Sequence, residues 1–272
     1  MPETPFVRID RVSKSFRTDA RTAPIAVIDD VSLEIGRGEL VVFLGPSGCG
    51  KTTLMRIVGG LETATRGRVL IDGETVDGPD RRKGMVFQSY SSFPWLNVLD
   101  NIRFGLKFRR DIDAAEKERL ARHYLALVRL TGFEDYYVNR ISGGMRQRIA
   151  IARTLAAGSD VLLMDEPFGA LDAQRRESLQ VELRRVQQTD AKTVVFVTHD
   201  VEEAVFLADR IFLFSARPAR ILEEVRVVDH LPDARPLELK ESEAFFHLRN
   251  RILGITRAQA LRTEQLMMEG HD

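Results

Sequence analysis

The sequence is poor in cysteine and in long apolar runs, and both shortages limit what the chain can be. Cys49 is its only cysteine, so no disulfide can form within the chain, and we expect a reducing compartment. No apolar run approaches the roughly 18 residues that a membrane-spanning helix needs. The opening MPETPFVRID carries charge and proline where a signal peptide would need an apolar run. We therefore expect a cytoplasmic chain whose membrane role, if any, passes through a partner.

Excess charge of either sign is also missing. Lys and Arg together number 40, as do Asp and Glu, which gives a formal net charge of zero. Proteins that bind nucleic acid usually carry an excess of basic residues. We therefore expect no nucleic-acid partner and no overall attraction to acidic lipid.

Three short apolar runs predict the centre of the fold. They are ELVVFLG at 39–45, DVLLMDEP at 160–167 and KTVVFVTHD at 192–200. None of them alternates with polar residues, which is typical of parallel strands that are covered on both faces. Each run ends in glycine or polar residues, and ligands of open α/β sheets lie at these carboxyl ends. The sequence thus predicts an α/β fold with a mainly parallel sheet.

Other segments have different patterns. Residues 1–40 and 66–78 predict an antiparallel β lobe at the N-terminal side, because GRVLIDGETVDG contains the Asp-Gly turn of a hairpin. Residues 89–157 predict an inserted helical lobe, and 209–229 predict two strands around a proline-containing turn. The tail at 230–272 is charged and weakly patterned, and only the spacing of Phe245, Leu248 and Ile252 suggests a short amphipathic helix there.

Apolar residues at helical spacing predict the buried faces of four helices. Asp113 with Glu116 resembles a capping box at the start of one of them. The four sets are Leu54, Ile57, Val58 and Leu61; Leu120, Tyr124, Leu127 and Val128; Met145, Ile149, Ala152 and Ala156; and Leu179, Leu183 and Val186.

The segment GPSGCGKT predicts a phosphate-binding loop. It matches G-x-x-x-x-G-K-[ST] between a predicted strand and a predicted helix, the context that this motif requires. Lys51 would reach the β- and γ-phosphates of a nucleotide, and the Thr52 hydroxyl would ligate Mg²⁺. We interpret Cys49 as a small residue that fits the loop, so its alkylation should block ATP binding. The residues predicted to bind nucleotide here are Gly45, Pro46, Ser47, Gly48, Cys49, Gly50, Lys51, Thr52 and Thr53.

Polar side chains at the ends of neighbouring strands predict the chemistry. Asp165 would hold Mg²⁺, and Glu166 would act as the general base on the attacking water. His199 ends the next strand run and would contact the γ-phosphate. Gln88 follows the apolar MVF and would reach the metal or the water through its amide. These residues predict an ATPase that needs Mg²⁺.

The segment ISGGMRQR at 141–148 predicts a second anion site at a helix start. Ser142, Gly143 and Gly144 could present a hydroxyl and two backbone amides to a phosphate. A plain capped helix would explain Ser142 alone. Two glycines directly after a cap are costly for a helix, which favours the close approach of a ligand.

Together these motifs resemble the ATP-binding subunit of ABC transporters, from about residue 6 to about 225. GPSGCGKTT is similar to the Walker A loop, VLLMDE to Walker B with Glu166 as catalytic glutamate, and ISGGMRQR to the signature, with Ile141 in place of the usual leucine. The resemblance implies a P-loop NTPase core over residues 1–229 and a homodimer. In that dimer, the signature of one subunit covers the ATP held by the other.

The same resemblance assigns three further residues. Asp172, which ends GALD, is similar to the D-loop aspartate, Gln88 to the Q-loop residue and His199 to the switch histidine. Phe16 is similar to the aromatic residue that stacks on adenine, where tyrosine is commoner, and core packing at a strand end is its alternative role.

The loop QSYSSFPW is similar to the segment that, in this family, binds the integral membrane permease. Phe93, Pro94 and Trp95 form an apolar group there, although Trp95 could instead fill the core of the helical lobe. FPW and SARPARI resemble importers of nitrate, sulfonates and taurine, which receive solute from a solute-binding protein. This predicts a peripheral subunit on the inner face of the cell membrane. The alternatives are a soluble ABC ATPase that acts on ribosomes or nucleic acid, and a catalytically silent regulatory module.

Overall fold

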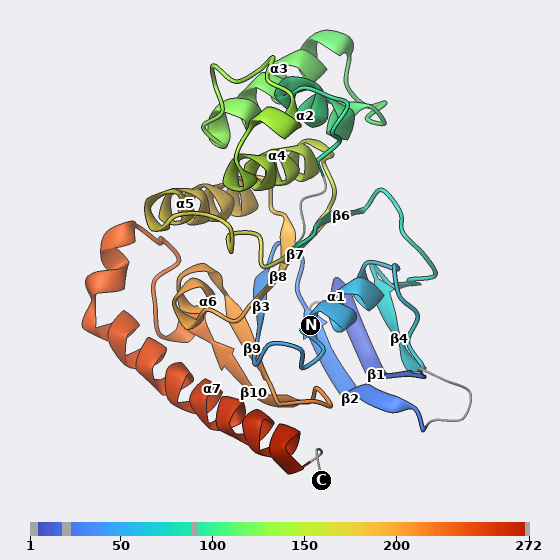
Figure 1. Ribbon diagram of the computed structural model, residues 1–272, viewed down its shortest axis with the longest axis vertical. Coiled ribbons are helices and arrows are strands. Elements are labelled where there is room, and N and C mark those ends of the chain that lie inside the picture. The colour runs from blue at the N-terminus through green and yellow to red at the C-terminus, as the bar shows by residue number, and fades with distance from the viewer. Residues whose placement is uncertain (1–4, 18–22, 89–91, 270–272) are drawn as a thin grey trace.

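The computed structural model describes residues 5–17, 23–88 and 92–269, the last ten as backbone only (Figure 1). Two sheets meet in its lower half, and a helical lobe of α2, α3 and α4 stands above them. This arrangement agrees with the α/β fold, the antiparallel lobe and the helical lobe that the sequence predicts. The boundary at residue 229 stays a prediction.

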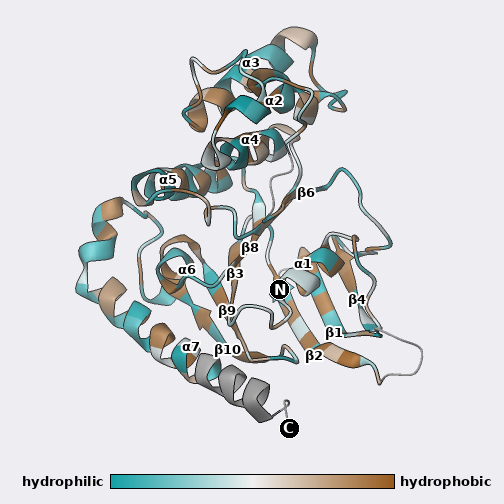
Figure 2. Cartoon of the chain, in the orientation of Figure 1, coloured by the Kyte–Doolittle hydropathy of each residue, from teal (hydrophilic) through white to brown (hydrophobic). Residues whose placement is uncertain are grey.

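The larger sheet carries the three predicted buried strands at its centre. Its order is β10-β9-β3-β8-β7-β6, and all neighbours are parallel except β9 and β10. Figure 2 shows much of this sheet in hydrophobic colours. The strands are β3 (Leu40–Leu44), β6 (Lys83–Val86), β7 (Val161–Asp165), β8 (Thr193–Thr198), β9 (Arg210–Phe214) and β10 (Ile221–Arg226).

The smaller sheet is antiparallel and forms the N-terminal lobe, in the order β2-β1-β4-β5. The predicted hairpin turns at Asp72 and Gly73, which both have positive φ angles of 54° and 79°. The strands are β1 (Val7–Phe16), β2 (Ile25–Ile35), β4 (Arg66–Ile71) and β5 (Glu74–Thr75).

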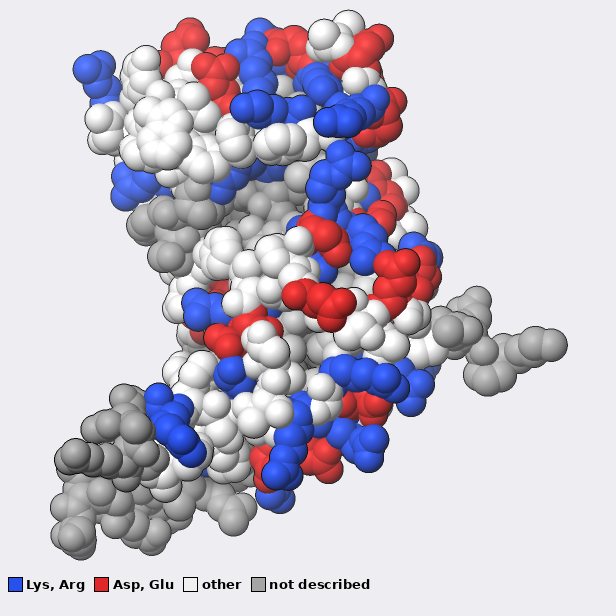
Figure 3. Space-filling view, turned by 90° about the vertical axis from the view of Figure 1, so that its right-hand side faces the viewer, with Lys and Arg blue, Asp and Glu red and all other residues white. Residues whose placement is uncertain are grey.

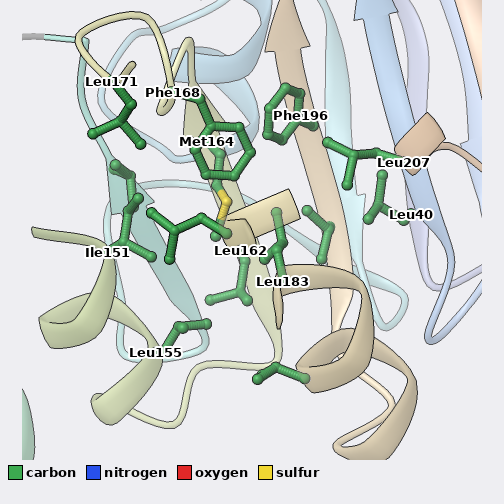
Figure 4. Close-up of a cluster of buried hydrophobic side chains, with 14 of the residues drawn as sticks. Leu40, Ile151, Leu155, Leu162, Met164, Phe168, Leu171, Leu183, Phe196 and Leu207 are labelled. Atoms are coloured by element: carbon green, nitrogen blue, oxygen red, sulfur yellow. The ribbon is translucent and has the colours of Figure 1, made fainter. Parts of the chain in front are cut away.

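Strand β3 separates two hydrophobic cores, because successive side chains of a strand point to opposite faces. Val41 and Phe43 pack with α1 (Lys51–Val58) and the antiparallel lobe. Leu40, Val42 and Leu44 belong to the other core, which extends to the helical lobe. Figure 4 shows part of that core, where residues of β7 and β8 meet residues of helices α4, α5 and α6. The sheet is therefore covered on both faces, as its unbroken apolar runs predict.

The helical lobe contains α2 (Val98–Leu106), α3 (Ala114–Leu127), η1 (Val138–Arg140) and α4 (Gly143–Ala156). Each α-helix starts at a side chain that accepts a backbone N–H, which is how a helix start satisfies its free donors. These caps are Asn97, Asp113 and Ser142. The predicted cap at Asp113 is confirmed, since its carboxylate accepts from the Glu116 amide at 2.8 Å.

Two expectations about helices are wrong. Leu61 lies beyond α1 and is 46% exposed, because the chain leaves the helix at Gly59 and Gly60 has a positive φ of 72°. The tail helix is long rather than short: α7 spans Glu243–Glu269. Its first turns bury Phe245, Leu248 and Ile252 as expected. It then continues through Arg, Ala, Gln, Leu and Met, which favour helix without an apolar stripe.

The remaining helices lie on the face of the larger sheet that carries Leu40, Val42 and Leu44, together with the C-terminal helix α7. They are α5 (Ala173–Thr189), α6 (Val201–Leu207), η2 (Val227–Asp229) and η3 (Leu237–Glu241), and α7 lies along α6. Arg217–Pro218 is a cis peptide in the turn between β9 and β10. No helix within the described residues is long and apolar enough to cross a membrane.

Candidate functional site

The phosphate loop connects the carboxyl end of β3 to the start of α1. A side chain at Gly45 would place its Cβ 2.9 Å from the Phe214 carbonyl oxygen, and one at Gly50 would approach the Val27 oxygen to 2.8 Å. Gly50 also has a φ of 126°, a conformation that favours glycine. No side chain caps α1, and its first turn holds no acidic residue. Its first amides are therefore available to bind an anion, because no capping side chain occupies them.

Lys51 is folded into this loop. Its side chain is only 4% exposed, and Nζ donates to the carbonyl oxygens of Gly45 at 2.8 Å and Pro46 at 2.7 Å. The Sγ of Cys49, also buried, lies 3.8 Å from the same nitrogen. Backbone carbonyl oxygens of the loop thus hold the Lys51 ammonium. A phosphate oxygen could take their place, because it accepts a stronger, charge-assisted hydrogen bond.

Thr52 and Asp165 are in contact although they lie 113 positions apart in the sequence. The Thr52 hydroxyl donates to Asp165 Oδ1 at 2.9 Å. Burial raises the pKa of the Asp165 carboxyl, and the Thr52 hydrogen bond opposes this shift. Hydroxyl and carboxylate oxygens suit Mg²⁺, which takes few protein ligands and completes its shell with water and phosphates. Among the described residues, no group of three His, Cys, Asp or Glu could hold a metal ion.

Three predicted catalytic side chains lie together at the next strand ends. Glu166 Oε1 is 2.9 Å from His199 Nδ1, and Gln88 Nε2 donates to Glu166 Oε2 at 3.2 Å. Glu166 has a φ of 45°, an unusual conformation for a non-glycine residue that is often found at functional sites. The carboxylate is thereby held between an imidazole and an amide, beside the residue that would hold Mg²⁺. Such a carboxylate can accept a proton from a water molecule.

The signature residues lie at the start of α4, in the helical lobe. Ser142 Oγ accepts from the Met145 amide at 3.3 Å, as a plain cap does. A cavity of about 460 Å³ is lined by Ser142, Gly143, Gly144 and residues of the 170–175 segment, and it includes no residue of the phosphate loop. The two predicted anion sites therefore lie apart from one another in the chain.

Asp172 lines the cavity beside the signature. It caps α5, and its pKa is lowered by the hydrogen bonds that it accepts from the amide and the side chain of Arg175. Gly144 also has a structural reason to be glycine: a Cβ there would lie 3.2 Å from Leu171 Cδ2 and 3.3 Å from the Ala170 oxygen. The close approach at Gly144 thus includes the chain's own loop, which the sequence alone does not indicate.

Phe16 ends β1 and is 40% exposed, so the alternative of core packing is wrong. Lys14 Nζ lies 4.7 Å from the centre of its ring. An exposed aromatic face of this kind can stack on a base. Its contact with adenine stays a prediction.

Trp95 does not fill the core of the helical lobe; it is 70% exposed, and Pro94 is exposed as well. Trp95 leans against the half-buried Phe93, whose ring centre is 5.5 Å from its own and 4.4 Å from that of Phe104. In this loop it is Phe93 that packs against the helical lobe, through Phe104, and Trp95 is left exposed to solvent.

A cavity of about 790 Å³ lies next to this aromatic group, between the helical lobe and the start of β6. Two further aromatic residues, Phe104 and Phe108, also line this cavity and were not predicted, although their i, i+4 spacing at the end of α2 is a possible signal. Five Lys and Arg residues and three Asp residues also line it. Figure 3 shows Lys and Arg side chains gathered over the helical lobe on one face of the molecule.

Comparisons with known proteins agree with this geometry. A family model described as ABC transporter matches residues 28–169. The chain is 41% identical to the aliphatic sulfonates import ATP-binding protein SsuB of Bacillus cereus, over 91% of this chain and 94% of that protein. It is 42% identical to the nitrate import ATP-binding protein NrtD of Synechocystis, over 86% and 90%. An uncharacterized ABC transporter ATP-binding protein of Methanocaldococcus jannaschii is 44% identical over 94% and 93%.

Solved structures give the same result for the fold. The dimeric ATP-binding cassette MJ0796, in a post-hydrolysis state bound to ADP and Pi, superposes with a TM-score of 0.73 at 33% identity. The match covers 81% of this chain and 98% of that one. A second dimeric structure of the same cassette matches equally well.

Proposed function

Because this chain belongs to the ABC transporter family and is an ABC ATPase, we propose that it powers the import of a small oxyanion such as nitrate, a sulfonate or taurine. The observation that carries the ATPase part is the group formed by Glu166, His199 and Gln88 beside Thr52 and Asp165. The oxyanion part is supported by the names of relatives that match most of the chain. Those names do not favour the alternative role on ribosomes or nucleic acid.

ATP binding would begin at the phosphate loop. The first amides of α1 and the Lys51 ammonium would hold the β- and γ-phosphates, after Lys51 gives up its two backbone oxygens. Thr52, Asp165 and Gln88 would hold Mg²⁺, which neutralises charge on the phosphate oxygens when it is bound. Phe16 would lie against the adenine ring.

Hydrolysis would depend on Glu166. Its carboxylate would take a proton from the attacking water, and His199 would hold the carboxylate and contact the γ-phosphate. Two copies of the chain would form the complete site, with Ser142, Gly143 and Gly144 of one copy covering the phosphate held by the other. The cavity at the signature supports this assembly, because it is lined by residues of α4 and of the Asp172 loop and by none of the phosphate loop.

The exposed aromatic group supports a permease partner. Phe93, Pro94 and Trp95 would contact the integral membrane subunit, since a large exposed aromatic beside a cavity is typical of an interaction site. The chain would then lie on the inner face of the membrane, and solute would reach the permease from a solute-binding protein.

Transport by a reconstituted complex tests this proposal. The chain is expressed with its candidate permease, and ATP-driven uptake of nitrate, a sulfonate and taurine is measured in vesicles that hold the complex with its solute-binding protein. We expect uptake of one of these anions, loss of uptake with Glu166→Gln, and loss of the permease from the purified complex with Phe93→Ala plus Trp95→Ala. The coupling surface is wrong if this double variant retains the permease, and the ATPase mechanism is wrong if Glu166→Gln still turns over ATP.

A further inference from the structure

A buried carboxyl group lies four residues after His199, in α6, and has no role in the mechanism above. Glu203 of α6 is only 6% exposed, and burial raises its pKa. Taking a carboxylate out of water is costly unless hydrogen bonds compensate. Its partners therefore indicate what the group is for.

Glu203 accepts hydrogen bonds from Gln180 Nε2 of α5 at 3.3 Å and from Thr198, and the second of these partners ties the chain on both sides of His199. The Thr198 hydroxyl donates to Glu203 Oε2 at 2.8 Å and accepts from the Asp200 amide at 3.0 Å. The Asp200 carboxylate in turn accepts from the Glu202 and Glu203 amides at the start of α6. The residues before and after His199 are thus both tied to one helix start, which fixes the backbone from which the imidazole reaches Glu166.

Arg176 extends this network to the loop that carries Asp172. Its Nη2 donates to the Leu171 carbonyl oxygen at 3.3 Å. Its Nη1 lies 3.7 Å from Asp200 Oδ2, and its Nε lies 3.8 Å from Glu203 Oε1. One guanidinium therefore connects the residue before Asp172 with the residue after His199.

We propose that Thr198, Glu203 and Arg176 are positioning residues for ATP hydrolysis. They hold His199 beside Glu166 and fix its position relative to the loop that carries Asp172. The proposal rests on the proposed role of His199. None of the three residues belongs to the phosphate loop, the metal site or the signature. They act by holding neighbours that do, so their loss should lower turnover and leave nucleotide binding intact.

A purely structural role would have other consequences. Burying charged groups contributes little net stability on average, because desolvation offsets their attraction. A network kept for stability alone would affect turnover no more than any other buried polar contact. A network that places His199 should lower kcat strongly, since small displacements of a reacting group are costly in rate.

Thr198→Val tests the proposal in the purified full chain. It removes the hydroxyl that joins Glu203 to Asp200 and nearly keeps the volume. We expect kcat for ATP to fall roughly ten- to hundredfold, while the affinity for ATP changes less than about twofold. Thr198→Ser, which restores the hydroxyl, should recover most of the activity.

Thr193→Val is the matched control. Thr193 is fully buried at the opposite end of the same strand, and its hydroxyl accepts from the Gly38 amide at 2.9 Å. This variant loses a comparable buried hydrogen bond far from His199, so it should lower the melting temperature without a comparable loss of kcat. An equal loss of kcat in both valine variants would overturn the proposal.

The His199→Ala background separates positioning from general damage. If Thr198 acts through His199, then Thr198→Val should lower kcat by less than about twofold once the imidazole is gone. Arg176→Met and Glu203→Gln should show the same dependence on His199. A full additional loss of kcat in the His199→Ala background would overturn the positioning role. His199→Ala with unchanged kcat would instead show that the proposed role of His199 is wrong.

Discussion

The phosphate loop and the signature loop both place a helix start where a phosphate could bind, yet the chain treats them differently. At the phosphate loop, Lys51 is buried and already bonded to two carbonyl oxygens of the loop. At the signature, Ser142 is exposed and lines a cavity. The first site is built to hold an anion within one chain, whereas the second has its amides and hydroxyl on an open surface. One chain thus supplies the phosphate loop with its cation, whereas the predicted anion site at the signature lies on an open surface.

The carboxyl groups beside the two loops extend this comparison. Burial raises the pKa of Asp165 next to the phosphate loop. Hydrogen bonds from Arg175 lower the pKa of Asp172 next to the signature. The fold thus disfavours the charged form of the Asp165 carboxyl, whereas it stabilises the charged form of the Asp172 carboxyl. Sites that bind metals commonly carry such unfavourable burial, because ligand binding relieves it.

Removal of the Lys51 ammonium should break the phosphate-loop side of the comparison. We expect Lys51→Ala to weaken ATP binding by a single subunit about 100-fold, because a buried charge-assisted partner of the phosphates is lost. Binding of a fluorescent ATP analogue to dilute protein measures this. Ser142→Ala, at the other loop, should leave this affinity unchanged; a similar loss there would mean that one chain uses both loops on one nucleotide.

A bulky cation at the signature should have the opposite effect: ATP binding by a single subunit is kept and hydrolysis is lost. Ser142→Arg should leave ATP binding by dilute subunits within about twofold of the wild type, because the phosphate loop is untouched. Hydrolysis should fall about 100-fold, since the arginine fills the space where the second subunit's nucleotide would lie. Steady-state ATPase assays at several protein concentrations measure this. Unchanged hydrolysis would contradict the dimer.

Mixing these two defective variants gives the sharpest form of the test. A mixed dimer of Lys51→Ala and Ser142→Arg subunits contains one site with both Lys51 and Ser142 intact. We therefore expect the mixture to hydrolyse ATP at a rate that neither variant reaches alone. No recovery at any mixing ratio would contradict a site built from two subunits, provided that each variant still enters dimers with the wild type.

The central sheet could be predicted from sequence because its strands are buried on both faces and their apolar runs are unbroken. The strand ends then place Asp165, Glu166 and His199 at one edge, and the observed order β8-β7-β6 also brings Gln88 to Glu166. That meeting needs a strand order, which single runs do not contain. Trp95 and the length of α7 were harder, since an apolar residue in a loop has several possible partners and a propensity-driven helix has no stripe.

The network around Glu203 could not be predicted for a different reason. Thr198, Asp200 and Glu203 are neighbours in sequence, but Arg176 reaches them only because α5 packs against α6. Side-chain contacts of this kind depend on the relative position of two helices, which local patterns do not determine. The sequence therefore predicts the groups assigned to the chemistry, but not the groups that we propose to position them.

The smallest expected effects concern stability and test the contrast between the two carboxyl groups. The raised pKa of Asp165 means that its contribution to folding is full below about 3.8 and is lost as pH rises through the folded pKa. Without nucleotide or Mg²⁺, Asp165→Asn should therefore raise the free energy of unfolding at pH 7 by about 1 kcal/mol, and this gain should vanish toward pH 4.

The lowered pKa of Asp172 has the opposite effect on stability. Its contribution is present above about 3.8 and is lost as pH falls through the folded pKa. Asp172→Asn should accordingly lower stability at pH 7, and only slightly, because asparagine still caps a helix. Urea unfolding of both variants and the wild type between about pH 2.5 and pH 8 measures the two slopes, that of Asp165 above about pH 4 and that of Asp172 below it. Slopes of the same sign would show that the two carboxyl groups do not differ in the way their burial and hydrogen bonds require.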